Sequence, residues 1–307
     1  MLTSFFNKSK PINFIVVFFI TLLAFIMSRI ELWNHGDTFN LSLKFFALIV
    51  VGYATVLLLN FIASKNGLTN NSNYEILLFG LFLLFISSTT LSGQVLVSNF
   101  FILLAIRRIV SLRTEQHMKK KLFDAAFWIG VASLFYFWAI LFFILVVLSL
   151  VLFADHKLRH WIIPFLGLAT LFVIACACSV VMYNDFFTIF NYPPEVSYDF
   201  SNYNSLKYII ALTVLFSFGV WSSIFYLQNI KKQKKNFRAS FKVIVLAMVI
   251  AFAIIVVAPN KNGSEFLFLF APLSIIVANY IEIIHEKWFK EAFLGVLVVL
   301  PFILLLL

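Results

Sequence analysis

Residues 122–153 read LFDAAFWIGVASLFYFWAILFFILVVLSLVLF, and this stretch decides the fold. Asp124 is its only charged residue, and it is longer than the roughly 20 residues that one helix needs to cross a bilayer. Basic residues flank it on both sides, in Lys119–Lys121 and in Lys157–His160. Since Lys and Arg concentrate on the cytoplasmic side, both ends should lie there. One crossing cannot return to the side it left, so we predict two short spans that turn near Ser133–Tyr136, with a re-entrant segment as the alternative.

The composition of the whole chain places it in a membrane. Apolar residues make up 63% of the sequence and charged residues 12%, which leaves too little polar surface for a soluble fold. We therefore predict an all-α fold, a polytopic transmembrane helical bundle of about 10 to 11 spans with the amino terminus inside. Residues 1–307 should form a single integral membrane domain, with possible halves at 1–121 and 122–307.

The other spans are the apolar runs between polar loops. We expect them at about residues 12–30, 43–63, 75–90, 95–109, 161–183, 208–228, 243–258, 266–284 and 292–307. In this arrangement, four of the 23 basic residues fall on the external side: Arg29, Lys44, Lys207 and Lys261. The charge distribution therefore agrees with alternating spans. No charged residue is expected at the middle of a span, which argues against an ion-coupled transporter.

The net charge of +10 would suggest a nucleic-acid partner in a soluble protein. Here the basic residues fall at span ends, where anionic lipid head groups attract them. We therefore expect membrane lipids, and no nucleic acid, as partners.

The first external loop contains the leading candidates for catalysis. Arg29, Glu31, His35 and Asp37 lie close together in the sequence. A carboxylate beside a histidine can take a proton from a hydroxyl nucleophile, or can hold a divalent cation that neutralises a diphosphate. A solvated loop with interfacial anchors is the alternative.

Two further external clusters could bind a substrate. Ser87–Gln94, followed by Ser98 and Asn99, forms a polar strip that could bind sugar hydroxyls, or could hydrogen-bond between helices. The long loop with Tyr192 and Asp199, together with Lys261 two spans later, combines aromatic rings, carboxylates and one cation. Aromatic rings and polar groups together are suited to carbohydrate, although aromatic residues are also common at membrane interfaces.

The layout of the chain resembles the membrane part of GT-C-type glycosyltransferases and related envelope-polysaccharide polymerases. The segment that begins NFFILLAIRR at residues 99–108 and continues to Phe153 carries most of this resemblance. The whole chain is also similar to an uncharacterised family of Bacteroidota inner-membrane proteins. The resemblance implies a multi-pass protein of the bacterial inner (cytoplasmic) membrane. GT-C members place an acidic catalytic residue in the first external loop, and the matching position is Asp37, with Glu31 second.

The leading hypothesis is a GT-C-like transferase or polymerase that acts on a polyprenyl-phosphate-linked sugar at the external face. Asp37 would be the base or the ligand of a divalent cation, assisted by Glu31 and His35. Arg29 and Lys261 would contact phosphate, while the substrate-binding candidates also include Gln94, Asn99, Tyr192 and Asp199. The main alternative is a non-catalytic subunit or scaffold that binds other envelope membrane proteins, and a third is a lipid or glycan translocase.

Overall fold

The computed structural model describes residues 2–34, 43–70, 72–153, 157–190 and 195–305, with side chains except at 31–34. The first half contains α1 (Leu2–Phe6), α2 (Pro11–Asn34), α3 (Leu43–Asn66), α4 (Tyr74–Phe85), η1 (Ser87–Thr90), α5 (Gly93–Val110), η2 (Ser111–Thr114), α6 (Met118–Phe135), η3 (Phe137–Phe142) and α7 (Phe143–Leu152). The second half contains α8 (Leu158–Tyr183), η4 (Thr188–Phe190), η5 (Ser201–Tyr203), α9 (Leu206–Lys232), α10 (Lys235–Val257), η6 (Ser264–Phe266), α11 (Leu267–Ile283) and α12 (Lys287–Leu304). Every regular element in these ranges is helical, which confirms the predicted all-α class.

Seven helices in the described ranges are long and apolar enough to cross a bilayer: α2, α3, α5, α8, α9, α10 and α11. The protein is therefore a multi-pass integral membrane protein. The remaining predicted spans correspond to α4, α6, η3 with α7, and α12. Of these, α4 and the η3–α7 segment are apolar but shorter, while α6 and α12 begin with charged turns.

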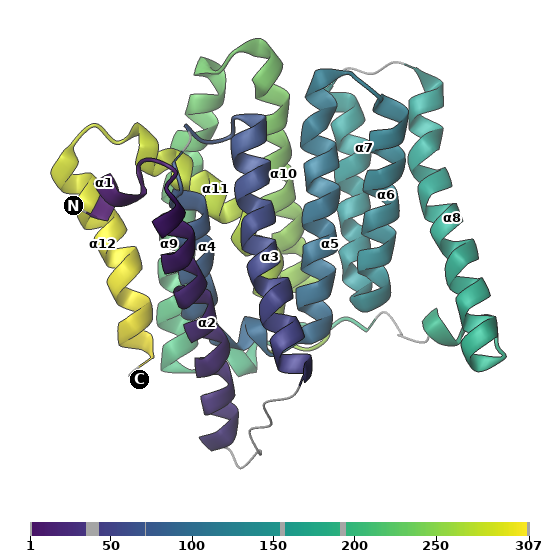
Figure 1. The fold of residues 1–307 in the computed structure, drawn as a ribbon, viewed down its shortest axis with the longest axis horizontal. Helices are drawn as coiled ribbons and strands as arrows, with labels where there is room; N and C mark the ends of the chain where they lie inside the picture. The colour runs from purple at the N-terminus through teal and green to yellow at the C-terminus, as the bar shows by residue number, and fades with distance from the viewer. Residues whose placement is uncertain (1, 35–42, 71, 154–156, 191–194, 306–307) are drawn as a thin grey trace.

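The run at 122–153 folds as the predicted hairpin. Helix α6 ends at Phe135, the backbone becomes extended at Tyr136, and η3 and α7 return along α6. The facing ends of α5 and α6 and those of α7 and α8 lie at the same end of the bundle (Figure 1). The turn falls within the predicted Ser133–Tyr136 segment, so the helical hairpin is confirmed, while a bilayer crossing by each of its two arms stays a prediction.

The bundle has two chemically different ends. One end of the bundle carries Lys119–Lys121 and Lys231–Lys235, and we call it the basic end. At this end lie the facing ends of α5 and α6, of α7 and α8, and of α9 and α10 (Figure 1). The α6–η3 turn and the described part of the α8–α9 connection lie at the opposite end, which we call the pocket end. There the Trp138 indole Nε1 donates a hydrogen bond of 3.1 Å to the Glu195 carbonyl.

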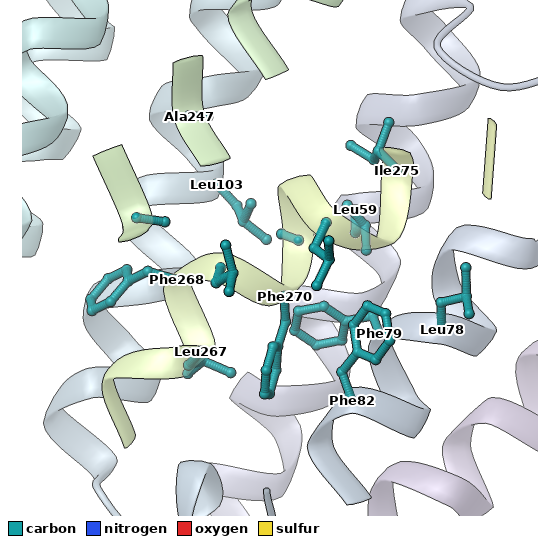
Figure 2. Packing of buried hydrophobic residues seen from close by; sticks show 14 of the residues in the cluster. Leu59, Leu78, Phe79, Phe82, Leu103, Ala247, Leu267, Phe268, Phe270 and Ile275 are labelled. Carbon is teal, nitrogen blue, oxygen red and sulfur yellow. The ribbon is translucent and has the colours of Figure 1, made fainter. Parts of the chain in front are cut away.

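The core is built around α4 and α11. Every residue of α4 is buried, and α4 packs against α2, α3, α11 and α12. The ring of Phe270 on α11 lies 6.4 Å from that of Phe79 and 5.8 Å from that of Phe82, centroid to centroid (Figure 2). These aromatic contacts join the two helices at the centre of the bundle.

Helix α8 lies at the edge of the bundle (Figure 1) and packs mainly on α6. Gly167 permits the close approach, since a Cβ atom there would lie 2.9 Å from the Phe123 carbonyl oxygen and 3.1 Å from the Ala126 Cβ. Small residues commonly allow membrane helices to pack this closely.

Thiol labelling tests the hairpin. In a variant with Cys176 and Cys178 replaced by alanine, Phe137→Cys and Tyr198→Cys should both react with an impermeant maleimide in intact cells, because both positions are exposed at the pocket end. Lys234→Cys, between α9 and α10, should react only after permeabilisation. If Phe137→Cys, like Lys234→Cys, reacted only after permeabilisation, that result would contradict the hairpin.

Substitution of Gly167 tests the α6–α8 contact. Gly167→Leu should destabilise the protein by about 1–3 kcal/mol, because the new side chain has to displace the α6 backbone. Thermal unfolding in mild detergent measures the effect. Gly295→Leu on α12 is the matched control, since a Cβ atom at that position would have no neighbouring atom within 4 Å, and equal losses in both variants would contradict the interpretation.

Candidate functional site

A polar cavity of about 220 Å³ opens at the pocket end of the bundle. We call it the amide pocket because three of its lining residues are Gln94, Asn260 and Asn262. The other lining residues are Ser92, Val95, Phe135, Tyr136, Phe137, Trp138, Pro259 and Ser264. Amide groups beside aromatic rings can hydrogen-bond to hydroxyl groups and stack on the apolar face of a sugar ring.

Three chain segments build the amide pocket. Ser92 caps α5, its Oγ accepting a hydrogen bond of 3.4 Å from the Val95 amide, so that Gln94 falls in the first turn of the helix. The hairpin turn at residues 135–138 supplies the aromatic wall. The third segment follows α10, where the Asn262 Oδ1 accepts hydrogen bonds from the backbone amide (3.1 Å) and hydroxyl (2.7 Å) of Ser264.

Tyr208 on α9 joins the third segment to η1. Its hydroxyl lies 2.7 Å from the Ser88 Oγ and donates to the Asn262 carbonyl at 3.2 Å. Gly263 has a positive φ of 89°, which a residue with a side chain adopts only with strain. Both features hold η6 against η1, and thereby set the position of the residue that follows Ser264.

Glu265, which follows Ser264, is a carboxylate buried beside the amide pocket. It is 1% exposed, and within the described part of the chain neither of its carboxylate oxygens has a hydrogen-bond partner. The ring of Tyr136 packs 5.5 Å from Phe268, in the first turn of α11. The pKa of the Tyr136 hydroxyl, at the turn, is raised mainly by burial and further by the negative charge of Glu265. Glu265 therefore lies within electrostatic reach of a residue that lines the pocket.

Asn99 is a second buried polar group near the pocket. It lies one helical turn beyond Val95, which lines the cavity, and it is 1% exposed. Neither its Oδ1 nor its Nδ2 has a hydrogen-bond partner among the described residues. Buried amides without partners are uncommon in proteins, and ligand or ordered water commonly satisfies them.

An apolar groove of about 270 Å³ adjoins the amide pocket. Its lining residues are Gly130, Ser133, Leu134, Phe137, Ile140, Leu168, Leu171, Phe172, Ile189 and Phe190. Phe137 lines both cavities. The hairpin turn therefore separates a polar cavity from an apolar one.

Residues of the predicted polar strip lie in two different environments. The Ser98 Oγ donates to the Ala132 carbonyl at 2.9 Å and joins α5 to α6, as the inter-helix alternative expected. Gln94, in contrast, lines the amide pocket, and Asn99 is buried one helical turn beyond Val95. Arg29 meets the strip at Thr90, where its Nη1 donates to the carbonyl at 2.8 Å and to Oγ1 at 3.0 Å.

The other substrate-binding candidates lie outside the amide pocket. Lys261 is 2% exposed, and its Nζ donates to the Ile255 and Val256 carbonyls at 2.6 Å each, at the end of α10. A phosphate would compete with both carbonyls for this ammonium group. Asp199 is exposed, and hydrogen bonding by Ser201 lowers the pKa of its carboxyl group.

Four predicted residues have no described side-chain geometry. His35, Asp37 and Tyr192 lie outside the described residues, and Glu31 lies in α2 with its side chain undescribed. Their proposed roles remain predictions. No group of three metal-ligating side chains occurs within the described ranges, so the divalent cation also remains a prediction.

Glu265, Tyr136 and Trp138 were missed as site residues by sequence reasoning. The Asn262-Gly263 pair marks a turn just before Glu265, and acidic residues are frequent at such helix starts. That pattern alone did not distinguish a solvated carboxylate from a buried one.

Comparison with known proteins gives one match. A family model described as "Family of unknown function (DUF6427)" matches residues 1–306. No curated protein and no solved structure matches the chain. The assignment of roles to residues therefore rests on geometry and chemistry.

Removal of the Tyr208 hydroxyl tests how the pocket is held together. Tyr208→Phe should lower stability by about 0.5–1.5 kcal/mol, because hydrogen bonds to Ser88 and Asn262 are lost. Thermal unfolding in detergent measures the change. Tyr198→Phe, at an exposed position of the same end, should leave the melting temperature unchanged. An unaffected Tyr208→Phe variant would show that these bonds do not hold η6 against η1.

Proposed function

This chain belongs to the DUF6427 family, and because that family has no assigned function, we propose one from the geometry. The protein is a bacterial inner-membrane transferase that acts on a lipid-linked sugar at its pocket end. It resembles GT-C-type enzymes in layout. The basic end is cytoplasmic and the pocket end is external, as the distribution of Lys and Arg predicts.

The observation that carries this proposal is the buried Glu265 carboxylate beside the amide pocket. A buried carboxylate without hydrogen-bond partners binds a proton more tightly than a solvated one, so its ionised form is a strong base, and general bases contribute about 10²–10⁴-fold to rate. In the proposed reaction, the base takes the proton of an acceptor hydroxyl. The hydroxyl oxygen then attacks the anomeric carbon of the sugar, whose bond to the lipid phosphate breaks. The amide side chains of Gln94, Asn260 and Asn262 would hold sugar hydroxyls.

The adjoining apolar groove supports a substrate with a lipid tail. A polyprenyl chain would lie in the groove between α6 and α8, with its sugar in the amide pocket and Phe137 between the two. A soluble sugar donor would have no use for the groove. The geometry thus favours a lipid-linked donor over a soluble one.

The predicted first-loop residues keep their proposed roles. Asp37 would be the base or the ligand of a divalent cation, with Glu31 and His35 in support, and Glu265 is a second candidate for the base. Arg29 would contact phosphate through the guanidinium that it anchors at Thr90. Lys261 would do so only by giving up its backbone carbonyls.

Two other functions would use the same surfaces differently. A non-catalytic subunit of an envelope complex would bind partner membrane proteins through its apolar helices, and loss of the carboxylates would leave it functional. A lipid or glycan translocase would need a path between the two ends. Phe79, Phe82 and Phe270 fill the centre of the bundle (Figure 2), which favours the transferase over the translocase in this conformation.

A transfer assay tests the proposal. The purified protein in vesicles is given a radiolabelled polyprenyl-phosphate-linked hexose together with envelope lipids and glycans as acceptors, and transfer of label is followed. Glu265→Gln or Asp37→Ala should reduce transfer by about 10²-fold or more, according to which carboxylate is the base. Glu195→Gln, a carboxylate in an exposed loop, is the control and should retain full activity.

Binding is measured separately through the Trp138 indole, which lines the pocket. Addition of the lipid-linked hexose should change the Trp138 fluorescence in wild type and in Glu265→Gln. The Trp138→Phe variant should show no such change on addition of the hexose. Full transfer by both carboxylate variants would refute the catalytic assignment. Binding without transfer by the wild type would favour the non-catalytic subunit.

A further inference from the structure

Glu75 is a second buried carboxylate, in the first turn of α4 at the basic end. Its exposure is 0%, and neither of its carboxylate oxygens has a hydrogen-bond partner in the described ranges. Asn73, which precedes α4, is also 0% exposed and without side-chain partners among these residues. Two adjacent buried polar groups without partners mark a site whose ligand the protein itself does not supply.

The nearby Glu282 on α11 has the opposite environment. Its Oε1 accepts hydrogen bonds from the Asn70 amide at 2.8 Å and the Ser72 hydroxyl at 2.5 Å. The Asn279 Nδ2 donates to the Leu68 carbonyl at 2.5 Å and so fixes the α3–α4 segment against α11. These donors offset part of the cost that burial imposes on a negative charge at Glu282, and when Glu282 is ionised its charge acts on Glu75.

Among the described residues, no cation forms an ion pair with Glu75. Lys290 on α12 lies 5.4 Å from the ring centre of Tyr74, and its charge acts on Glu282 and Glu291. Glu291 accepts hydrogen bonds from Thr3 of α1. On α3, Lys65 lies over the ring of Phe61. The described part of α2 has its one charged side chain, Arg29, at the pocket end.

We propose that Glu75 is a proton-binding site, with Glu282 as the carboxylate through which its proton exchanges with the basic end. An ionised carboxylate without partners is very costly in a protein interior, and a bound proton removes that cost. Two neighbouring carboxylates cannot both ionise cheaply, so the proton resides on the one without donors. A hard metal ion would need about six oxygen ligands, whereas a proton needs only Glu75.

This inference does not depend on sugar transfer at the other end. It gives the basic end a chemical activity of its own, the reversible uptake of a proton at the start of α4. Glu75 lies in α4 at one end of the central pair, and Glu265 lies in η6, which leads into α11 at the other end, so the proposed proton site and the amide pocket are joined through α4 and α11.

Carbodiimide labelling tests the proposal. Dicyclohexylcarbodiimide enters apolar sites and modifies protonated carboxyl groups, and peptide mass spectrometry locates the product. The full-length protein in vesicles should be labelled at Glu75 at neutral pH, with labelling lost as pH rises. Glu282→Gln should move the loss of labelling to lower pH, because the like charge that favours protonation is gone. Exposed Glu286 is the internal control and should remain unlabelled.

Infrared spectroscopy supplies a second readout that needs no reagent access. At neutral pH, the C=O stretching band of protonated carboxyl groups should be weaker in a Glu75→Gln variant of unchanged melting temperature than in wild type, and the difference spectrum isolates the Glu75 component from that of other buried carboxyl groups such as Glu265. Absence of both the label and this difference would overturn the proposal. Protection of Glu75 from labelling by sodium ions, at constant pH, would also overturn it in favour of a metal-ion site.

Discussion

The contact between α4 and α11 is the interaction on which the rest of the structure depends. With a rise of 1.5 Å per residue, α4 is about 18 Å long and cannot cross a bilayer of about 30 Å alone. The rings of Phe79 and Phe82 pack on Phe270 and bury the short helix within the bundle. Because α4 is short, the polar residues of η1 also lie inside the protein, where η6 can pack against them.

The sequence predicted the fold well because spans and their orientation depend on local composition. The length of the 122–153 run and its basic flanks sufficed to predict the hairpin, and the turn lies where expected. Gln94 lies in the first turn of its helix and lines the amide pocket, Ser98 joins α5 to α6 as the inter-helix alternative expected, and sugar binding by the strip stays a prediction. Hydrophobic length and charge asymmetry require no knowledge of which helices touch.

The candidate site was predicted less completely because burial depends on neighbours far away in the sequence. Glu75 and Glu265 fall near span ends, where a side chain can commonly reach the interface. In the structure both are enclosed by helices that the sequence alone could not pair with them. Lys261 likewise seemed an external cation from its position, yet its ammonium group is bound to the end of α10.

Phe137, which lines both the amide pocket and the apolar groove, has a consequence for how a substrate would arrive. A lipid-linked sugar whose tail enters between α6 and α8 would not leave the bilayer at any stage. Its encounter with the protein would then be a search in two dimensions, in which the relevant concentration is molecules per unit of membrane area. Confinement of this kind raises the effective concentration of a ligand without any new contact. A pocket with few hydrogen bonds could therefore remain occupied, and product could leave sideways into the same leaflet.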